Sequence, residues 1–211
     1  GKKSQKVSLF FFFFVIPMEV NDGNMSLTRE EYALAERAQT DDAAFSLLYE
    51  RYFPKIYAYI FRRLGNREQT EDVVSVTFEK VFLHLDKFKP GGGGTFQAWI
   101  YRIATNAVID YIRKEKHTIS MAPEDLPEEI HPTTGLDATH EMIKLEDSES
   151  VQRVIKKLPQ RYQEVIQLKY FSELSNIEVA EVLQISPNNA GVLLSRALKQ
   201  FSEQYKRHEK P

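Results

Sequence analysis

Hydrophobic residues recur every three or four positions along three long segments of the chain. The first set is Phe45, Tyr49, Phe53, Ile56, Ile60 and Leu64; the second is Val74, Phe78, Val81, Phe82 and Leu85; the third is Phe96, Trp99, Ile100, Ile103, Ala107 and Tyr111. This spacing places each set on one face of an α-helix. It therefore predicts three amphipathic helices, each with an apolar stripe that packs against a core.

Capping residues precede the predicted helices. Asp41, Asn66 and Thr95 stand just before the three segments, and their side chains can accept hydrogen bonds from the free backbone N–H groups of a helix start. An earlier helix is expected to begin at Thr28 as N-cap, because Glu31 three residues later completes a capping box. Four helix starts are thus predicted in the first half of the chain.

Shorter helices are expected in the last third. The helical pattern resumes at 148–158, and Pro159 suits the first position of the helix that follows. Ser175 and Glu178 form another capping-box pattern, which predicts a short helix over 177–183. Because no segment shows the alternation typical of a strand, the chain is predicted to be all-α.

Two segments differ from the helical ones. Residues 118–147 hold three prolines and eight carboxylates against one lysine, a net charge of −7 that leaves about +5 on the rest of the chain. We expect this segment to be a flexible acidic linker that packs no core and is cut first in limited proteolysis. Residues 1–24 include the apolar run 9–16, which is too short for a membrane span of about 20 residues. They are expected to be a disordered or non-native extension, with a signal peptide or a membrane-touching or regulatory tail as alternatives.

Composition narrows the function classes. The 211 residues include no cysteine, which removes disulfides, cysteine-ligated metals and thiol nucleophiles and fits a reducing cytoplasm. The five histidines have no i, i+4 spacing, and the glycines at 91–94 are not followed by the Lys-Ser/Thr of a phosphate loop. We therefore expect no metal, no cofactor, no small-molecule substrate and no catalytic site.

A helix-turn-helix is the first candidate for binding chemistry. Ser186 and Pro187 predict the start of a helix over 187–206, directly after the helix over 177–183. Ala180, Leu183, Ile185, Ala190 and Leu194 would fill the angle between the two helices. The second helix would present to DNA Ser186, Asn188, Asn189, Val192, Ser195, Arg196 and Lys199. From spacing alone, an ordinary helical hairpin explains the pattern equally well.

The third long helix is the second candidate. It mixes aromatic and polar or basic side chains that suit unpaired nucleotides, namely Trp99, Tyr101, Arg102, Asn106, Arg113 and Lys114. The alternative for Trp99 is a place in the core, because it lies on the apolar stripe.

The order of these segments resembles a known family. Residues 71–88 (EDVVSVTFEKVFLHLDKF) and 96–116 (FQAWIYRIATNAVIDYIRKEK) are similar to the second conserved region of bacterial RNA polymerase sigma factors. Residues 158–186 (LPQRYQEVIQLKYFSELSNIEVAEVLQIS) and 195–201 (SRALKQF) are similar to the fourth region. With only these two regions, the chain resembles the extracytoplasmic-function (ECF) group. The resemblance implies a region 2 domain over 25–117, the linker over 118–147 and a region 4 helix-turn-helix domain over 148–211.

The resemblance also implies partners and sites. They are core RNA polymerase (its clamp and flap), promoter DNA with its −10 and −35 elements, and an anti-sigma factor, in the cytoplasm. Contacts with the clamp would fall on Asp72, Ser75, Val76, Thr77 and Phe78. The melted −10 strand would meet the loop 87–95 and Arg102, Asn106, Asp110, Arg113 and Lys114. The −35 duplex would meet the reading helix of the helix-turn-helix.

The sequence departs from the family pattern at a few positions. Ser75 and Val76 stand where family members often carry glutamine and an acid, and Gln184 stands where the turn commonly holds glycine. Gly191 and Leu193 occupy places in the reading helix that are often basic. A stand-alone helix-turn-helix regulator and a helical adaptor that does not bind DNA are the alternative functions, and the region 2 motif at 99–113 disfavours the former.

Overall fold

The computed structural model describes residues 23–89, 94–120 and 149–208, with side chains over 29–89, 94–115 and 151–207. Within this part of the chain every regular element is helical, which confirms the all-α prediction. The first group is α2 (Gly23–Arg37), α3 (Asp42–Leu64), α4 (Arg67–His84), the short 3-10 helix η1 (Leu85–Lys87) and α5 (Phe96–Ser120). The second is α7 (Glu149–Lys156), α8 (Gln160–Ile166), the π-helix η2 (Gln167–Phe171), α9 (Asn176–Leu183) and α10 (Pro187–His208). We call these groups the N-terminal bundle and the C-terminal domain.

The capping predictions hold at the long helices. The Asp41 carboxylate accepts from Ala43 N at 2.9 Å, and the Asn66 amide oxygen accepts from Gln69 N at 3.0 Å. Gly65 ends α3 with φ of +70°, a conformation that favours glycine. Local side-chain chemistry therefore sets these helix ends.

Two helix boundaries differ from the prediction. The earliest helix, α2, already begins at Gly23, so Thr28 lies inside it and is not its N-cap. The helix α5 continues to Ser120, three residues beyond the predicted limit of 117. Residues 1–22 of the extension and residues 121–147 of the acidic segment lie outside the described residues.

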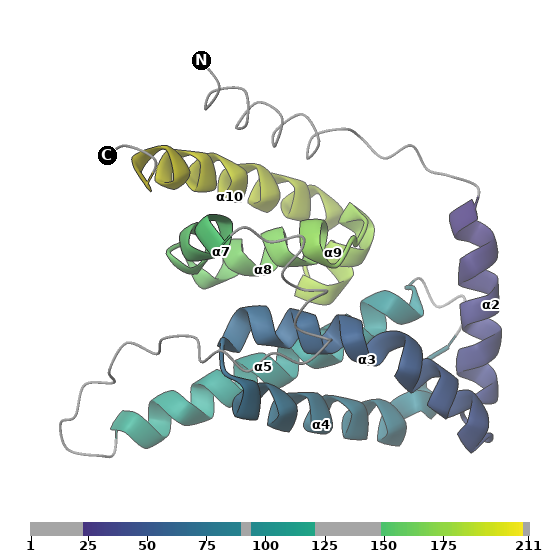
Figure 1. The fold of residues 1–211 in the computed structure, drawn as a ribbon. Helices are drawn as coiled ribbons and strands as arrows, with labels where there is room; N and C mark the ends of the chain where they lie inside the picture. Colours follow the sequence, from purple (N-terminus) through teal and green to yellow (C-terminus); the bar gives the residue numbers. More distant parts are fainter. Residues whose placement is uncertain (1–22, 90–93, 121–148, 209–211) are drawn as a thin grey trace.

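The N-terminal bundle packs α3, α4 and α5 side by side, while α2 crosses one end of the bundle (Figure 1). Its core is aromatic as well as aliphatic. The Phe96 ring meets the Tyr52 ring edge-on at 5.3 Å between centroids, and Tyr59 meets Tyr101 in the same way at 5.3 Å. Trp99 is 8% exposed, so it belongs to the core, as the alternative interpretation of this residue predicted.

The predicted apolar stripes are right for most positions and wrong for a few. The core face of α3 is formed by Leu48, Tyr52, Ile56, Tyr59 and Ile60, whereas Phe45, Tyr49 and Phe53 lie on the flank that faces α4. In α4 the Phe82 side chain is 56% exposed, because residues 74, 78, 81 and 85 already occupy the buried face.

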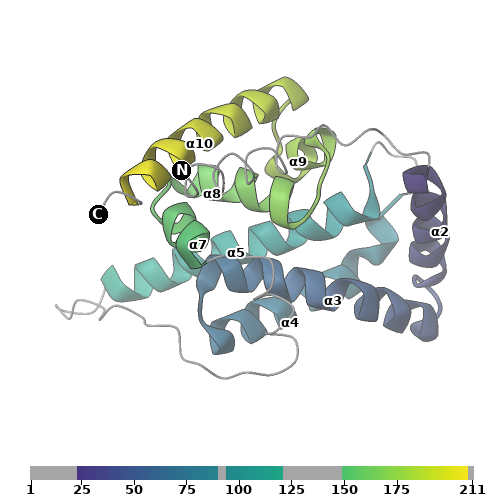
Figure 2. The same ribbon diagram turned by 45° about the horizontal axis from the view of Figure 1, so that its top comes forward.

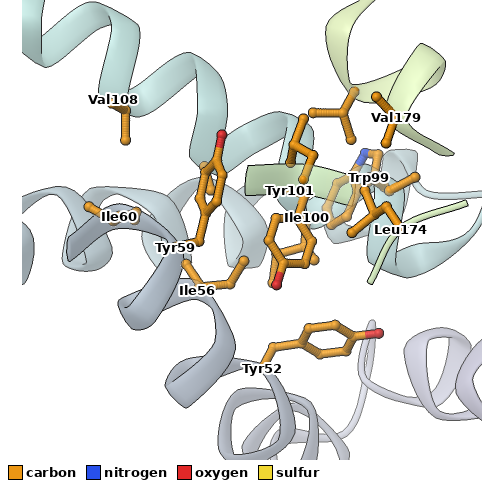
Figure 3. Packing of buried hydrophobic residues seen from close by; sticks show 14 of the residues in the cluster. Tyr52, Ile56, Tyr59, Ile60, Trp99, Ile100, Tyr101, Val108, Leu174 and Val179 are labelled. Carbon is orange, nitrogen blue, oxygen red and sulfur yellow. The ribbon is translucent and has the colours of Figure 1, made fainter. Parts of the chain in front are cut away.

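The C-terminal domain lies on the N-terminal bundle as a second layer (Figures 1 and 2). Helix α9 packs along α5, and Trp99 of α5 lies beside Leu174 and Val179 (Figure 3). Both of those C-terminal side chains are buried, at 0% and 2% exposure. The two predicted helical domains are present, and their hydrophobic cores are continuous in this structure.

A buried ion pair joins the two layers. Arg63 of α3 donates from Nη2 to Glu164 Oε1 of α8 at 2.9 Å, and the two side chains are only 2% and 6% exposed. On the bundle side, Arg63 Nη1 also donates to the Tyr59 hydroxyl, which pairs with the Thr105 hydroxyl at 2.8 Å. Burial raises the pKa of Tyr59, so this phenol stays neutral. The interface therefore contains a continuous polar network inside an apolar surround.

The turn of the helix-turn-helix offers a stability test. Gln184 ends α9 with φ of 54° and ψ of 46°, a left-handed conformation that costs a residue with a Cβ about 1 kcal/mol. We expect Gln184→Gly to raise the free energy of unfolding by about 0.5–1 kcal/mol, because glycine removes that strain at some cost in chain entropy. Thermal unfolding followed by circular dichroism measures the change. Gln184→Val is the matched control and should lower the melting temperature; a lower value for the glycine variant would contradict the prediction.

Candidate nucleic-acid interface

The reading helix α10 is fixed at its start by Ser186. Its hydroxyl accepts from Asn189 N at 3.2 Å, and Pro187 occupies the first helical position. Before it, Ser175 and Glu178 form the expected reciprocal capping box at the start of α9. The small buried residues Ala180 and Ala190 lie between the two helices, as expected of a helix-turn-helix. This confirms the structural part of the prediction.

One face of α10 is polar and exposed. The side chains expected to read duplex DNA are all exposed, namely Ser186, Asn188, Asn189, Val192, Ser195, Arg196 and Lys199. Several of them line a shallow, open hollow of about 460 Å³, formed by Pro187, Asn188, Gly191, Val192, Ser195 and Arg196. Leu193 is half-buried against the core, so it is not available for DNA contacts. The exposed amides and cations can donate to base edges and phosphates.

A second polar stripe runs along α5. Arg102, Asn106, Asp110 and Arg113 follow one another at intervals of four, four and three residues, which keeps them on one side of the helix. Asn106 is exposed. Asp110 accepts from Arg113 at 2.9 Å and lies 3.9 Å from Lys80 Nζ on α4. The structure thus brings these predicted residues together, and Lys114 follows them on α5.

The loop before α5 is anchored at both described ends. Phe88 is buried among the rings of Tyr32, Phe96 and Trp99, at centroid distances of 5.9, 5.2 and 5.6 Å. At the other end, Thr95 caps α5 by accepting from Ala98 N at 3.1 Å. Residues 90–93 lie outside the described part. Lys87 and Lys89 are exposed on the first side of the loop, where they can approach a phosphate backbone.

Helix α9 approaches the second end of this loop. Thr95 Oγ1 donates to Glu178 Oε1 at 2.6 Å, and the Tyr32 hydroxyl donates to the Gly94 carbonyl at 3.1 Å. Gly94 lies so close to the Glu181 carboxylate that a Cβ there would collide with it. Burial raises the pKa of Glu181, and the neighbouring Arg102 guanidinium partly opposes this rise. The C-terminal domain therefore touches the predicted strand-binding region of the bundle.

The predicted polymerase contacts on α4 divide into two groups. Asp72, Ser75 and Val76 are exposed. Thr77 and Phe78 are 0% and 7% exposed, and the Thr77 hydroxyl donates to the carbonyl of Val73 within the helix. These two side chains point into the bundle and stabilise its core, so the exposed surface of the predicted clamp contact consists of the other three residues.

Sequence reasoning missed an apolar surface on the same bundle. Leu83 is 60% exposed and Phe82 56%, with Val76 at 42% on the same helix; Tyr49 of α3, whose ring contacts Phe78 of α4, is 39% exposed. The Phe82 ring contacts the Phe45 ring edge-on at 5.1 Å, which fixes its position on this surface. The sequence signal for this surface was the pair Phe82 and Leu83, because two adjacent large apolar residues stand where the apolar stripe of the helix needs only one. Exposed apolar clusters of this kind mark protein-binding surfaces.

Other chemistry is not apparent in the described ranges. Among residues 23–89, 94–120 and 149–208, no three histidine or acidic side chains gather as metal ligands would. In the same part of the chain, no helix combines the length and the apolar character needed to cross a bilayer.

Comparison with protein families assigns both domains. The model described as Sigma-70 region 2 matches residues 48–118, and the model described as Sigma-70, region 4 matches residues 148–201. Together the matches cover more than half of the 211 residues.

Curated relatives give the same result over about three quarters of the chain. The ECF RNA polymerase sigma factor SigW of Bacillus subtilis is 34% identical over 175 residues, covering 78% of this chain and 90% of the relative. The ECF RNA polymerase sigma factor SigM of the same organism is 25% identical, over 76% of this chain and 94% of the relative.

Solved structures share the fold. CnrH, in complex with the cytosolic domain of CnrY, superposes with a TM-score of 0.62 at 24% identity, covering 84% of this chain and 97% of that one. The sigma factor RpoE of Bartonella quintana, in complex with the anti-sigma factor NepR, gives a TM-score of 0.61 at 21% identity, with coverage of 77% and 96%.

Proposed function

We propose a separate role in transcription initiation for each of the two domains, given that the chain belongs to the ECF RNA polymerase sigma factors and contains sigma-70 regions 2 and 4. A sigma factor is not an enzyme; it directs promoter recognition and the initiation of transcription. In this proposal the N-terminal bundle, as region 2, holds the polymerase and the melted −10 strand. The C-terminal domain, as region 4, reads the −35 duplex and contacts the flap.

The observation that carries the proposal is the pair of exposed polar faces on two helices. On α10 the exposed asparagines, with Arg196 and Lys199, offer both base-edge and phosphate contacts. On α5, the exposed Asn106 offers an amide to an unpaired base. One face suits duplex DNA and the other suits a single strand, as an initiation factor requires.

Binding of the polymerase clamp is assigned to the exposed surface of α4. Asp72, Ser75 and Val76 remain in this assignment, and Phe82 and Leu83 are added because they are apolar and exposed. A mixed polar and apolar surface of this kind is typical of protein interfaces. We also propose a cytoplasmic location, where polymerase acts, and an anti-sigma factor as a regulatory partner.

Run-off transcription with core polymerase tests the function. The chain should give promoter-dependent product only when both it and core polymerase are present, with promoters selected by the reconstituted complex. A stand-alone regulator would instead bind a specific duplex tightly by itself and would give no new product with core polymerase. That second result would contradict the proposal.

The reading helix gives a gain-of-function test. At Gly191 a Cβ would meet nothing within 4 Å, so a long side chain fits without strain. We expect Gly191→Arg to strengthen non-specific duplex binding. The dependence of the binding constant on salt concentration should steepen by the amount expected for about one additional phosphate contact. Binding measured by fluorescence anisotropy across a salt series gives this slope. Gly191→Ala is the control, since it gains the same helix stability, about 1 kcal/mol, without the charge; equal slopes for both variants would contradict the assignment.

A further inference from the structure

Two carboxylates of the C-terminal domain lie against the start of α5. Glu178 accepts the Thr95 hydroxyl hydrogen at 2.6 Å. Glu181, one turn further along α9, lies over Gly94 and interacts electrostatically with Arg102. These bundle positions are the ones that the proposed function assigns to the promoter strand. Negative groups from the same chain therefore face the positions where DNA phosphates would approach.

The Glu178 carboxylate lies between two helix starts. One oxygen accepts from Ser175 N at 2.8 Å within the capping box of α9. The other accepts from Thr95, whose hydroxyl in turn caps α5. The first turn of a helix carries partial positive charge, which attracts anions. Glu178 thus accepts hydrogen bonds from residues at the starts of both α9 and α5. A phosphate oxygen could take its place at the start of α5.

Simple packing does not account for the acidic character of this contact. Glu31 of α2 reaches the same place, where it accepts from the Tyr52 hydroxyl and lies near Glu178. Burial raises the pKa of Glu31 and of Glu181, and the like charge of Glu178 adds to each rise. Gathering three carboxylates at a partly buried contact is unfavourable, and apolar residues would dock the domains at less cost.

We propose that Glu178 and Glu181 are an internal substitute for the promoter strand, which blocks the strand-binding start of α5 while the two domains are docked. This inference rests on the proposed function. In the docked state Thr95 is hydrogen-bonded to the Glu178 carboxylate and Glu181 lies over Gly94 within electrostatic range of Arg102, while the reading face of α10 stays exposed. Single-stranded DNA and the two glutamates then compete for one place, so engagement of the strand requires α9 to leave.

The test combines binding with a distance measurement on the full chain. The variant Glu178→Gln/Glu181→Gln removes both charges, and glutamine at 178 still completes the capping box. The control Glu36→Gln/Glu50→Gln removes two exposed charges from α2 and α3 outside the contact. Because the chain has no cysteine, cysteines introduced at exposed Glu79 and Glu203 take spin labels specifically.

The probe is a short, fluorescently labelled single-stranded oligonucleotide of mixed sequence. We expect the 178/181 variant to bind it about tenfold more tightly than the unsubstituted chain, because the phosphates then meet no like charge at the start of α5. We also expect saturating oligonucleotide to lengthen the distance between the spin labels, because the strand displaces α9. The control pair should bind more tightly only by the general effect of charge. Equal gains for both pairs, or a distance that the oligonucleotide leaves unchanged, would overturn the inference. The proposed function is judged separately, by run-off transcription with the unsubstituted chain.

Discussion

Glu164→Ala is expected to separate the two domains without unfolding either. The substitution leaves the Arg63 guanidinium, now 2% exposed, without its carboxylate at 2.9 Å. An uncompensated buried charge of this kind costs about 3–5 kcal/mol. Arg63 can regain water only if α8 moves away from α3, so the strain is relieved by undocking. Small-angle scattering should show a larger radius of gyration, while circular dichroism should show unchanged helix content.

The chain provides a matched control for this prediction. Arg67 and Glu71 form an ion pair of similar length, 2.8 Å, but both side chains are more than half exposed. An exposed pair contributes about 0–1 kcal/mol, so Glu71→Ala should leave the protein compact. The double variant Arg63→Met/Glu164→Leu should also stay docked, because apolar residues of similar size replace a buried pair at little cost. A compact Glu164→Ala protein that loses helix content on mild heating would contradict undocking.

Asn106→Ala is expected to slow promoter opening about tenfold to a hundredfold. The amide side chain is exposed on the polar stripe of α5, where it can hydrogen-bond a base displaced from the duplex. Loss of one such contact costs about 1–3 kcal/mol in the open complex. Permanganate footprinting of the melted strand measures the opening, and a binding assay with core polymerase should show no change.

The exposure of Asn106 also separates this role from a structural one. A side chain that only held a neighbouring helix would lower the melting temperature when removed, whereas we expect thermal unfolding to stay the same. Glu36→Ala, an exposed position of α2 outside the DNA-binding faces, is the control and should affect neither measurement. Normal melting of promoter DNA by a folded Asn106→Ala protein would rule out the proposed role.

The features that the sequence predicts well are local ones. Asp41, Asn66, Thr95, Ser175 and Ser186 each cap a helix as expected, because a cap depends on residues only two or three positions away. The helix-turn-helix follows from the same short-range chemistry together with small residues at the crossing. The resemblance added the DNA-binding roles, which stay predictions for the individual side chains.

The features that the sequence does not predict depend on contacts between distant segments. Tyr101 and Val108 lie outside the predicted stripe of α5, yet they are 1% and 0% exposed. The pattern assumed one buried face, whereas α5 is covered by α3 and α4 on one side and by α9 on another. Burial raises the pKa of Tyr101 to about 12. The Arg63–Glu164 pair spans 101 positions and leaves no periodic signal.

The docked interface also sets the apparent affinity of every partner that binds only the separated domains. Such a partner sees its intrinsic dissociation constant divided by the separated fraction of molecules. If about 1% of molecules are separated, the partner binds about 100-fold more weakly than it would bind a permanently separated protein. If polymerase is such a partner, substitutions at Arg63 and Glu164, which are buried between the two domains, should change polymerase occupancy in the cell. The amount of active sigma factor then depends on the fraction of molecules whose domains are separated, as well as on expression.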